Sequence, residues 1–332
     1  MRTSRCNVID PIIFSFTLFG RTISLRWYGV LVMLGAVVGG WFAEKEVTRR
    51  GEKGAHVWDA MIWVIPVGVI GARLWFVVNA TLGGNNYYLQ NPIQIINIPQ
   101  GGLHFFGGLL FGAIALFYYM RRFNLDPWLF LDAIAPVTLI GQAVARPANF
   151  INQELYGQPT TLPWGIPIEA IHRIPPYDNL SLYPLTTRFH PTFAYEMIWN
   201  FLAAALLLWI ARRYADRIKP GTILGGWLVA AGVGRALIEI FRPDQPRIPG
   251  TVITYSAFVS MLMAVAGLVL LLARFGKIKL GSFTFPDAYR IAPDLTPEAA
   301  PASVSHPAPQ AVPAKRRSST QTARRASRLK KK

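Results

Sequence analysis

Several residues that can bind a charged group lie close together in one stretch, residues 141–157, which reads GQAVARPANFINQELYG. It contains Arg146, Asn149, Asn152 and Glu154 and closes an apolar segment long enough to cross a membrane. An ionisable side chain at membrane depth is costly and usually functional. Snorkelling of a helix-end arginine is the alternative for Arg146. The neighbouring amides and carboxylate favour a site that binds a polar ligand.

A second pair of charged residues, Arg235 and Glu239, lies four positions apart in another apolar segment. Residues at this spacing share one helix face and could pair. A buried ion pair that only joins two helices is an equally weighted interpretation. With Arg146, Arg235 supplies two guanidinium groups that carboxylates compensate only in part. Such a site suits a phosphate, bound bidentately without a metal, and the phosphate available at membrane depth belongs to a phospholipid.

Other polar residues have simpler interpretations beside a functional one. Tyr28 lies at the start of an apolar segment, where aromatic residues often mark the membrane interface. Arg73 lies near the end of the next one and could be an anchor in the same way. The single Cys6 excludes an internal disulfide and a cysteine-rich zinc site. The five His residues show no metal-binding spacing, so neither a metal nor a cofactor is predicted.

The composition predicts what positions these residues. Of the 332 residues, 52% are hydrophobic and only 15% are charged, and the mean hydropathy is +0.31. Soluble domains have about a quarter charged residues, so this is an all-α polytopic membrane protein. We predict seven transmembrane helices from the stretches of spanning length, at about 24–44, 57–79, 102–120, 127–148, 191–211, 221–241 and 252–274.

Basic residues in the loops predict the orientation. They follow the first, third and fifth predicted spans, whereas residues 80–101, between the second and third, include no Lys or Arg. The positive-inside rule then places the N-terminus outside and the C-terminus in the cytoplasm. The Arg146 and Arg235 regions both fall in the outer half. The long loop between spans four and five, about 151–190, is predicted to form a small extracytoplasmic cap.

The two ends of the chain differ from the seven predicted spans, which belong to one domain of residues 1–280. An apolar run from Ile12 to Phe19 is too short to span and precedes no small-residue cleavage site, so we predict an interfacial segment and no removable signal peptide. Residues 281–332 are rich in Pro and Ala and then polybasic, with nine of the 34 Lys and Arg in the last 18 positions. This tail is expected to be disordered and cytoplasmic. Its expected partner is an anionic lipid surface, and no specific nucleic acid.

From about Asp10 to Arg274 the chain resembles the bacterial prolipoprotein diacylglyceryl transferases. The block NFINQELYG follows the signature R-x-x-N-F-I-N-x-E of that family and is highly specific. The other matching pieces are RWYG at 26–29, GxR with a later Asn at 71–79, GGLHFFGG at 101–108, RFHPTFAYE at 188–196 and GRALIEIFRPD at 234–244.

The resemblance implies a reaction in the bacterial plasma (inner) membrane. The diacylglyceryl group of phosphatidylglycerol moves to the lipobox cysteine thiol of a prolipoprotein signal peptide, and glycerol phosphate leaves. Sulfur attacks the glycerol carbon that bears the phosphate. A base that forms the thiolate and cations that stabilise the leaving phosphate lower the barrier.

The resemblance also implies roles for individual residues. Arg146 matches the arginine that binds phosphatidylglycerol in the family, and Arg235 matches a second essential arginine. The expected catalytic residues are Arg235, His104, Glu154, Glu239 and Tyr28, and the expected substrate-binding residues are Arg146, Asn149, Gly157, Arg73, Arg242 and His190.

The chain departs from the family pattern around the site. The family reads G-G-x-S-F-H-G-G, and its His is the proposed base for the thiol. Here Phe106 takes that position and His104 takes the Ser position, about 200° away on a helix. His104, His190 and Glu154 are therefore all candidate bases. The other departures are Ala148, Phe193 and Ala231, at family Gly, Gln and Tyr positions.

These departures leave a second function open. A catalytically silent relative that binds phospholipid or lipoprotein would keep the arginines and lack the base. A transporter is disfavoured because the sequence has no inverted repeat and no paired broken helices.

Overall fold

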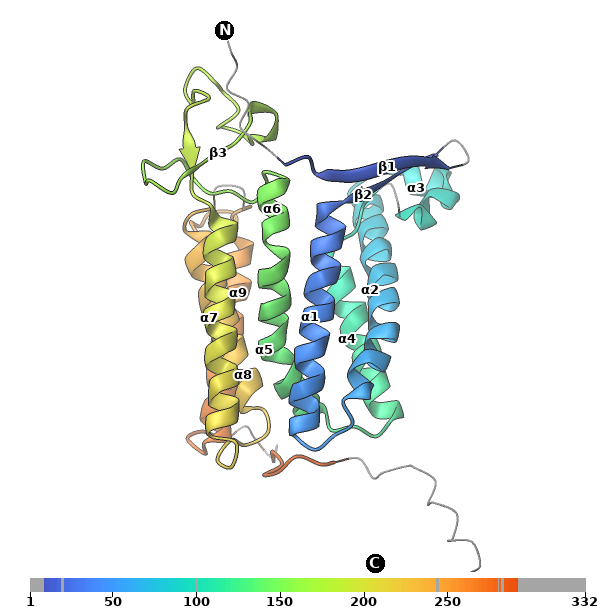
Figure 1. The fold of residues 1–332 in the computed structure, drawn as a ribbon, viewed down its shortest axis with the longest axis vertical. Helices are drawn as coiled ribbons and strands as arrows, with labels where there is room; N and C mark the ends of the chain where they lie inside the picture. Colours follow the sequence, from blue (N-terminus) through green and yellow to red (C-terminus); the bar gives the residue numbers. More distant parts are fainter. Residues whose placement is uncertain are drawn as a thin grey trace, which may run out of the picture. The chain divides into compact units, whose positions relative to one another are not determined.

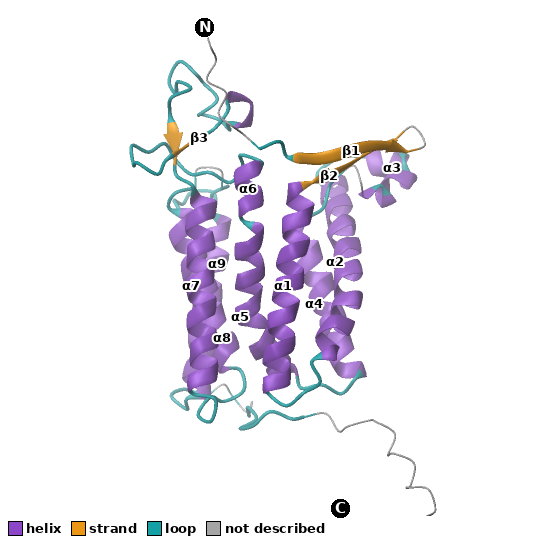
Figure 2. Ribbon diagram, in the orientation of Figure 1, coloured by secondary structure: helices purple, strands orange, loops and turns teal. Residues whose placement is uncertain are grey.

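A computed structural model describes residues 9–18, 21–98, 101–242, 245–279, 281 and 284–291 of the chain. The chain divides into a unit of Met1–Ala292 and a unit of Pro293–Lys332. Long helices that run side by side make up most of the first unit (Figures 1 and 2). Of the predicted tail, residues 281–332, only 281 and 284–291 belong to the described part of the chain.

Within the described residues, six helical segments are long and apolar enough to cross a membrane. This confirms a mostly helical polytopic membrane protein. The prediction of seven spans is not confirmed, since α4, Phe105–Arg122, covers the predicted third span but is not among the six. The six are α1 (Trp27–Arg49), α2 (Ala55–Leu82), α5 (Pro127–Ala145) continued by α6 (Pro147–Ile151), α7 (Thr192–Arg213), α8 (Thr222–Glu239) and α9 (Tyr255–Arg274).

The helices pack through small residues and leave large apolar side chains on the outside. At the α1–α5 crossing, a Cβ atom added to Gly35 would lie 2.4 Å from the carbonyl oxygen of Gly141. Only glycine allows this approach, which is typical of helix packing in membranes. Outward-facing side chains such as Ile62, Trp63 and Leu202 remain 69%, 63% and 65% exposed. A lipid environment covers such a surface, so the bundle needs little apolar burial of its own.

An antiparallel hairpin precedes the bundle. Its strands are β1 (Ile12–Leu18) and β2 (Arg21–Arg26), and β2 leads directly into α1. The sequence analysis identified this region only as an interfacial run. Phe14 and Phe16 alternate with polar residues and are exposed, which is the period of a strand. The hairpin lies at the end of the bundle where α1 begins (Figure 1).

The predicted cap region, about 151–190, is an irregular segment between α6 and α7. It contains β3 (Ile166–Pro167), the short helix η3 (Ala170–His172) and β4 (Arg188–Phe189), and β3 pairs antiparallel with β4. A small core of Tyr156, Ile168, Tyr177 and Phe189 holds it together. The β3 region lies at the same end of the bundle as the hairpin (Figure 1). The loop between α2 and α4 carries two further short helices, α3 (Tyr87–Gln90) and η1 (Pro92–Ile96).

Candidate functional site

Arg146 lies at the junction between α5 and α6. Pro147 is the first residue of α6, a position that tolerates proline because its missing N–H needs no partner there. After α6, Gln153 and Leu155 adopt positive φ angles of 52° and 54°. The chain therefore turns back sharply, and the backbone N–H of Glu154 donates to the Asn149 carbonyl at 3.0 Å. The local sequence itself thus brings the polar side chains together.

The side chains of this turn form a hydrogen-bonded chain. Asn149 Nδ2 donates to Glu154 Oε1 at 2.8 Å, and Asn152 Nδ2 donates to the same oxygen at 3.3 Å. Asn149 Oδ1 in turn accepts from Arg146 Nη1 at 3.3 Å. Asn149 is 6% exposed, so its amide fixes the guanidinium and the carboxylate relative to each other.

Glu196 of α7 binds the other half of the Arg146 guanidinium, through Nη2. The sequence analysis assigned no role to Glu196, although it closes the RFHPTFAYE motif. The signal that could have found it was a carboxylate one turn inside an apolar span. The Arg146 Nε atom is buried, and no described group accepts from it.

The second arginine forms the pair predicted from its spacing. Arg235 Nη2 lies 2.8 Å from Glu239 Oε2, and Arg235 Nε donates to Ser256 Oγ at 2.9 Å. Thr254 Oγ1 donates to the other Glu239 oxygen at 2.7 Å. Glu239 is 8% exposed, so its carboxylate is held on both sides.

The charges around Arg235 place it in the same region as Arg146. Arg235 interacts with Arg146, Glu196 and Arg242 as well as with Glu239. Arg242 follows the end of α8, where its N–H donates to the Glu239 carbonyl at 3.0 Å. Three guanidinium groups and the carboxylates of Glu196 and Glu239 therefore act on one another, and Glu154 is linked to Arg146 through Asn149.

Gly157 and His190 connect the cap to the bundle. The Gly157 N–H donates to the His190 carbonyl at 2.8 Å, and a Cβ atom at Gly157 would lie 2.7 Å from the Phe241 carbonyl oxygen. The His190 ring contacts Tyr195 through a 3.0 Å hydrogen bond to its hydroxyl. Burial lowers the pKa of His190, which keeps the imidazole neutral near pH 7. The position of Gly157 requires glycine because the packing leaves no space for a side chain.

Arg73 and Tyr28 are not joined to Arg146 by any contact among the described residues. Arg73 is buried, and its guanidinium donates to four backbone carbonyls at 2.5–3.1 Å, all in the 94–102 segment before α4. It therefore holds that segment in place. Tyr28 is the second residue of α1 and is 46% exposed. Their substrate-binding and catalytic roles stay predictions.

His104 lies against α2. It is the N-cap residue of α4, its ring centroid is 6.4 Å from that of Trp75, and it is 5.7 Å from the Phe106 ring. Its Nδ1 atom is buried, with no partner among the described groups. No described contact joins His104 to Arg146 or Glu154. The base therefore stays unassigned among the three candidates.

The other departures from the family pattern are apolar packing positions. Phe193 packs beside Phe150, with the ring centroids 5.8 Å apart and the rings tilted by 46°. Ala148 is fully buried, and Ala231 packs against the main core. None of the three adds a polar group to the site.

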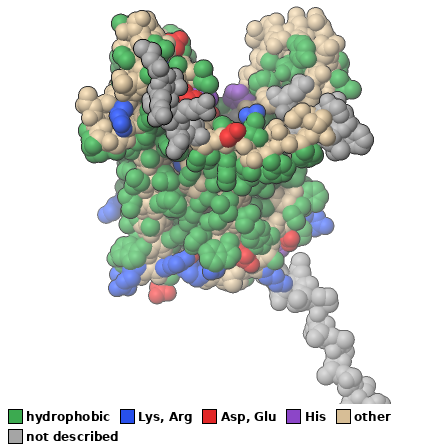
Figure 3. Space-filling view, turned by 45° about the horizontal axis from the view of Figure 1, so that its top comes forward, with side chains coloured by type: hydrophobic (Ala, Val, Ile, Leu, Met, Phe, Trp, Pro, Cys, Tyr) green, Lys and Arg blue, Asp and Glu red, His purple; other side chains and the backbone are tan. Residues whose placement is uncertain are grey.

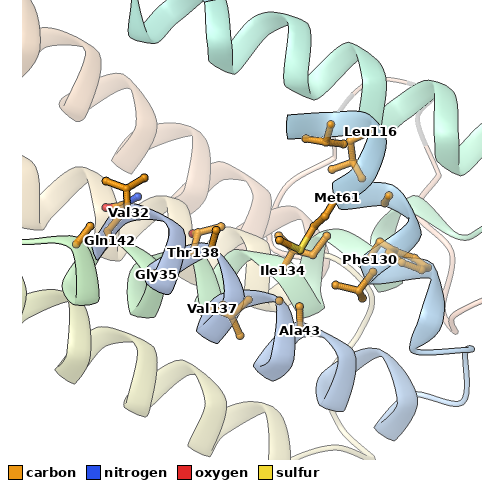
Figure 4. Close-up of a pocket in the computed structure, with 18 residues that line it drawn as sticks. Val32, Gly35, Ala43, Met61, Leu116, Phe130, Ile134, Val137, Thr138 and Gln142 are labelled. Atoms are coloured by element: carbon orange, nitrogen blue, oxygen red, sulfur yellow. The ribbon is translucent and has the colours of Figure 1, made fainter. Parts of the chain in front are cut away.

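An apolar cavity of about 390 Å³ runs through the bundle beside the site. Its walls come from α1, α2, α4 and α5, and nearly all its lining residues are apolar. Figure 4 shows Val32 and Gln142 at one end and Phe130 near the other. Ala145 also lines the cavity and directly precedes Arg146. The cavity thus extends along the helices to the turn that precedes Arg146.

The end of the bundle that carries the hairpin and the cap is hollowed between two raised parts (Figure 3). Histidine, basic and acidic side chains lie in the hollow. No three His, Cys, Asp or Glu side chains within the described ranges are grouped so that they could hold a metal ion. The arginines of the site can bind an anion, the cavity can hold an apolar chain, and the carboxylates can transfer protons.

Comparison with known proteins matches most of the chain to one protein family. The profile of the family described as prolipoprotein diacylglyceryl transferase matches residues 11–273. A Chloroflexus aggregans phosphatidylglycerol–prolipoprotein diacylglyceryl transferase is 37% identical over 243 residues, which cover 71% of this chain and 78% of the relative. Relatives of the same name from Leifsonia xyli and Enterococcus faecalis are both 34% identical, covering 74% and 78% of this chain and 74% and 89% of their own lengths.

Proposed function

Because the chain belongs to the prolipoprotein diacylglyceryl transferase family, we infer that it transfers the diacylglyceryl group of phosphatidylglycerol to a prolipoprotein, the first step of lipoprotein maturation. The observation that carries this function is the presence of an arginine and the lining of an apolar cavity at neighbouring positions at the end of α5. Ala145 lines the cavity, and the next residue is Arg146. A phospholipid has the same arrangement, a phosphate joined to apolar chains.

We propose that the phosphate of the lipid binds between Arg146 and Arg235, with an acyl chain in the cavity. In the structure carboxylates hold both guanidinium groups, Glu196 for Arg146 and Glu239 for Arg235. The phosphate accordingly competes with Glu196 for the partly exposed Arg146. Asn149, held by Glu154, orients the guanidinium during this exchange.

The proposed reaction starts with loss of the proton of the lipobox cysteine thiol. The thiolate attacks the glycerol carbon that bears the phosphate, the new C–S bond forms, and the C–O bond breaks. Its electron pair leaves with glycerol phosphate, and the two arginines stabilise the developing charge. A thiol with a pKa of about 8.5 is a few per cent ionised near neutrality, so a weak base suffices. His104, His190 and Glu154 are the candidates.

We further propose that α4 also crosses the membrane, as the third span in chain order, which brings the total to seven. Its 18 residues extend about 27 Å at 1.5 Å per residue, close to the thickness of a bilayer core. Leu109, Leu110 and Ile114 are exposed along it, and Arg121 and Arg122 close it. The N-terminus then lies outside the bacterial plasma membrane, and the basic end of each odd-numbered span lies in the cytoplasm.

The same orientation places the two ends of the chain. The transferase domain spans residues 1–280 with its cap at 151–190 outside, and the tail beyond it lies in the cytoplasm. The basic residues of that tail contact anionic lipid head groups. Phosphatidylglycerol and the lipobox cysteine of the signal peptide meet under the cap.

The test is transfer by the purified protein of labelled diacylglyceryl from phosphatidylglycerol to a lipobox peptide. The peptide with serine in place of cysteine is the matched control. A labelled thioether product from the cysteine peptide alone is the expected result. No product, under conditions in which a related transferase works, would refute catalysis and favour the silent lipid-binding relative. Phe106, at the position of the family base, is the observation that favours this second function.

A further inference from the structure

A buried carboxylate with three arginines lies at the end of the bundle opposite to the hairpin. Glu46, near the end of α1, is fully buried. Its Oε2 atom pairs with Arg49 at 2.9 Å and Arg50 at 2.8 Å, and its Oε1 atom pairs with Arg212 of α7 at 2.8 Å. One carboxylate cannot compensate three guanidinium groups. The cluster is therefore positively charged around a fixed centre.

Neighbouring charges reduce the excess but do not remove it. The buried Asp132 carboxylate accepts from two backbone N–H groups and from the Tyr289 hydroxyl. It also interacts electrostatically with Arg50 and Arg274. Asp216 lies on the wall of the adjacent pocket. Arg274 also interacts with Asp287, which pairs with Lys219 at 3.2 Å. Four arginines and one lysine then face four carboxylates, which leaves room for one negative charge.

The pocket beside the cluster is a built cavity of about 170 Å³. Arg49, Arg50, Asp216 and Tyr289 line it. Arg50 is only 5% exposed, and its two terminal nitrogens donate to Glu46 and to the Asp132 carbonyl, so the innermost cation is fixed. The terminal Nη1 atoms of Arg49 and Arg212 donate to no acceptor among the described groups. Both side chains, 31% and 51% exposed, can bind a further anion.

A segment beyond the last helix forms one side of this pocket. Tyr289 donates to Asp132 Oδ2 at 2.8 Å, and the Arg290 N–H donates to Asp126 Oδ2 at 2.7 Å. The Phe285 ring lies 5.6 Å from the Trp128 ring, beneath the Arg274 guanidinium. Residues 284–291, which the sequence analysis assigned to the tail, thus contact the helix ends and complete the pocket.

The surroundings of the pocket identify the source of the anion. On α1, Trp41 is 45% exposed, with Lys45 stacked 3.4 Å over its ring. On α7, Leu206 and Trp209 are each 55% exposed and precede Arg212. Each helix thus carries exposed apolar and indole side chains that are followed along the chain by a basic residue, Lys45 on α1 and Arg212 on α7, as at a membrane interface. A ligand with a phosphate at the pocket and chains along these faces fits this pattern.

We propose that Arg49, Arg50 and Arg212 form a second phospholipid site, which binds the single phosphodiester of a lipid in the leaflet at this end of the helices. This site is separate from the Arg146 site, so the lipid bound here is not the phosphatidylglycerol that reacts in the proposed transfer. It binds a resident lipid and needs the 284–291 segment for one wall. Asp216 disfavours a second negative charge, which restricts the ligand to a phosphodiester.

The test counts dioleoyl-phosphatidylglycerol molecules retained by the detergent-solubilised full chain in native mass spectrometry. All variants carry R146A, which removes the outer arginine. R49Q/R212Q should weaken retention of one lipid about tenfold or more, because each substitution removes a charge-assisted hydrogen bond to the phosphate and such bonds contribute strongly to binding. K277Q/K279Q removes the same charge from exposed residues just after α9 and should leave retention unchanged. Equal losses in both double variants would overturn the proposal.

A second variant guards against misfolding of the double variant. D216N removes the opposing charge and should strengthen retention about two- to fivefold, within the usual range for an exposed charge pair. Unchanged or weaker retention in D216N contradicts the proposal. Inorganic phosphate is the competitor that separates the sources of the anion. Retention of the lipid in the presence of inorganic phosphate supports the proposed phospholipid site. Full displacement of the lipid by inorganic phosphate shows a site for any phosphate anion and overturns the proposal. Transferase activity of R49Q/R212Q with Arg146 intact should persist, so its outcome is independent of the proposed function.

Discussion

The substitution R146K tests whether Arg146 binds the phosphate with two separate nitrogens. In the structure the guanidinium uses Nη1 for Asn149 and Nη2 for Glu196. A phosphate that replaces Glu196 therefore still leaves Nη1 oriented by Asn149. Lysine keeps the charge but has one nitrogen, which cannot reach both partners in this fork geometry. The variant loses one charge-assisted hydrogen bond to the leaving phosphate.

Such a bond contributes about 1.5–3 kcal/mol. At about 1.4 kcal/mol for each factor of ten, kcat/KM for phosphatidylglycerol should fall about tenfold to a hundred-and-fiftyfold. The assay follows labelled diacylglyceryl transfer to the lipobox peptide over a range of lipid concentrations. R188K is the control, because Arg188 lies in the cap and donates to the Gly165 carbonyl. A value for R146K within twofold of the wild type would refute the two-nitrogen clamp.

Three further substitutions test the surroundings of the site. G157A should destabilise the cap by about 1–3 kcal/mol through overpacking, since its Cβ would lie 2.7 Å from the Phe241 carbonyl oxygen; thermal unfolding in detergent measures this, and a wild-type midpoint would contradict the packing argument. G39L should shift the enzyme towards phosphatidylglycerol with shorter acyl chains, because Gly39 lines the cavity and only the Val137 carbonyl lies within 4 Å of its Cβ position; unchanged chain preference in competition assays would exclude the cavity as the acyl site. Burial lowers the pKa of His190 in the folded protein, so the unfolded chain binds a proton at His190 before the folded protein does as the pH falls below about 6.5. The free energy of unfolding of the wild type should therefore decrease more steeply below this pH than that of H190Q. Parallel pH profiles of the two proteins would contradict this.

The periodic and compositional features of the chain could be predicted without a structure. Six of the seven predicted spans correspond to helices of spanning length and hydropathy, because a membrane helix needs only a continuous apolar segment. The Arg235–Glu239 pair followed from its four-residue spacing. The hairpin at Ile12–Arg26 was missed because a two-stranded ribbon at an interface needs only a few alternating residues.

Long-range partners could not be predicted in the same way. Nothing in the sequence indicates that Glu196, 50 positions away, binds Arg146. Nor does it indicate that the Arg73 guanidinium donates to backbone carbonyls in the loop before α4. His104 was one of three candidate bases by sequence, and only the structure gives its neighbours, Trp75 of α2 and Phe106. Such pairings depend on how the helices are rotated and packed, and spacing along one helix does not encode this.

The sequence by itself determined that this is a membrane protein with a compact run of polar residues at 141–157, since hydropathy and local turns are properties of neighbouring residues. It also determined the family, because the NFINQELYG block is local. The tertiary structure alone decided that Glu196 pairs with Arg146, and that four helices enclose an apolar cavity that reaches Ala145. The physical reason is that an ion pair between distant residues and an enclosed volume arise only when separate helices are packed together.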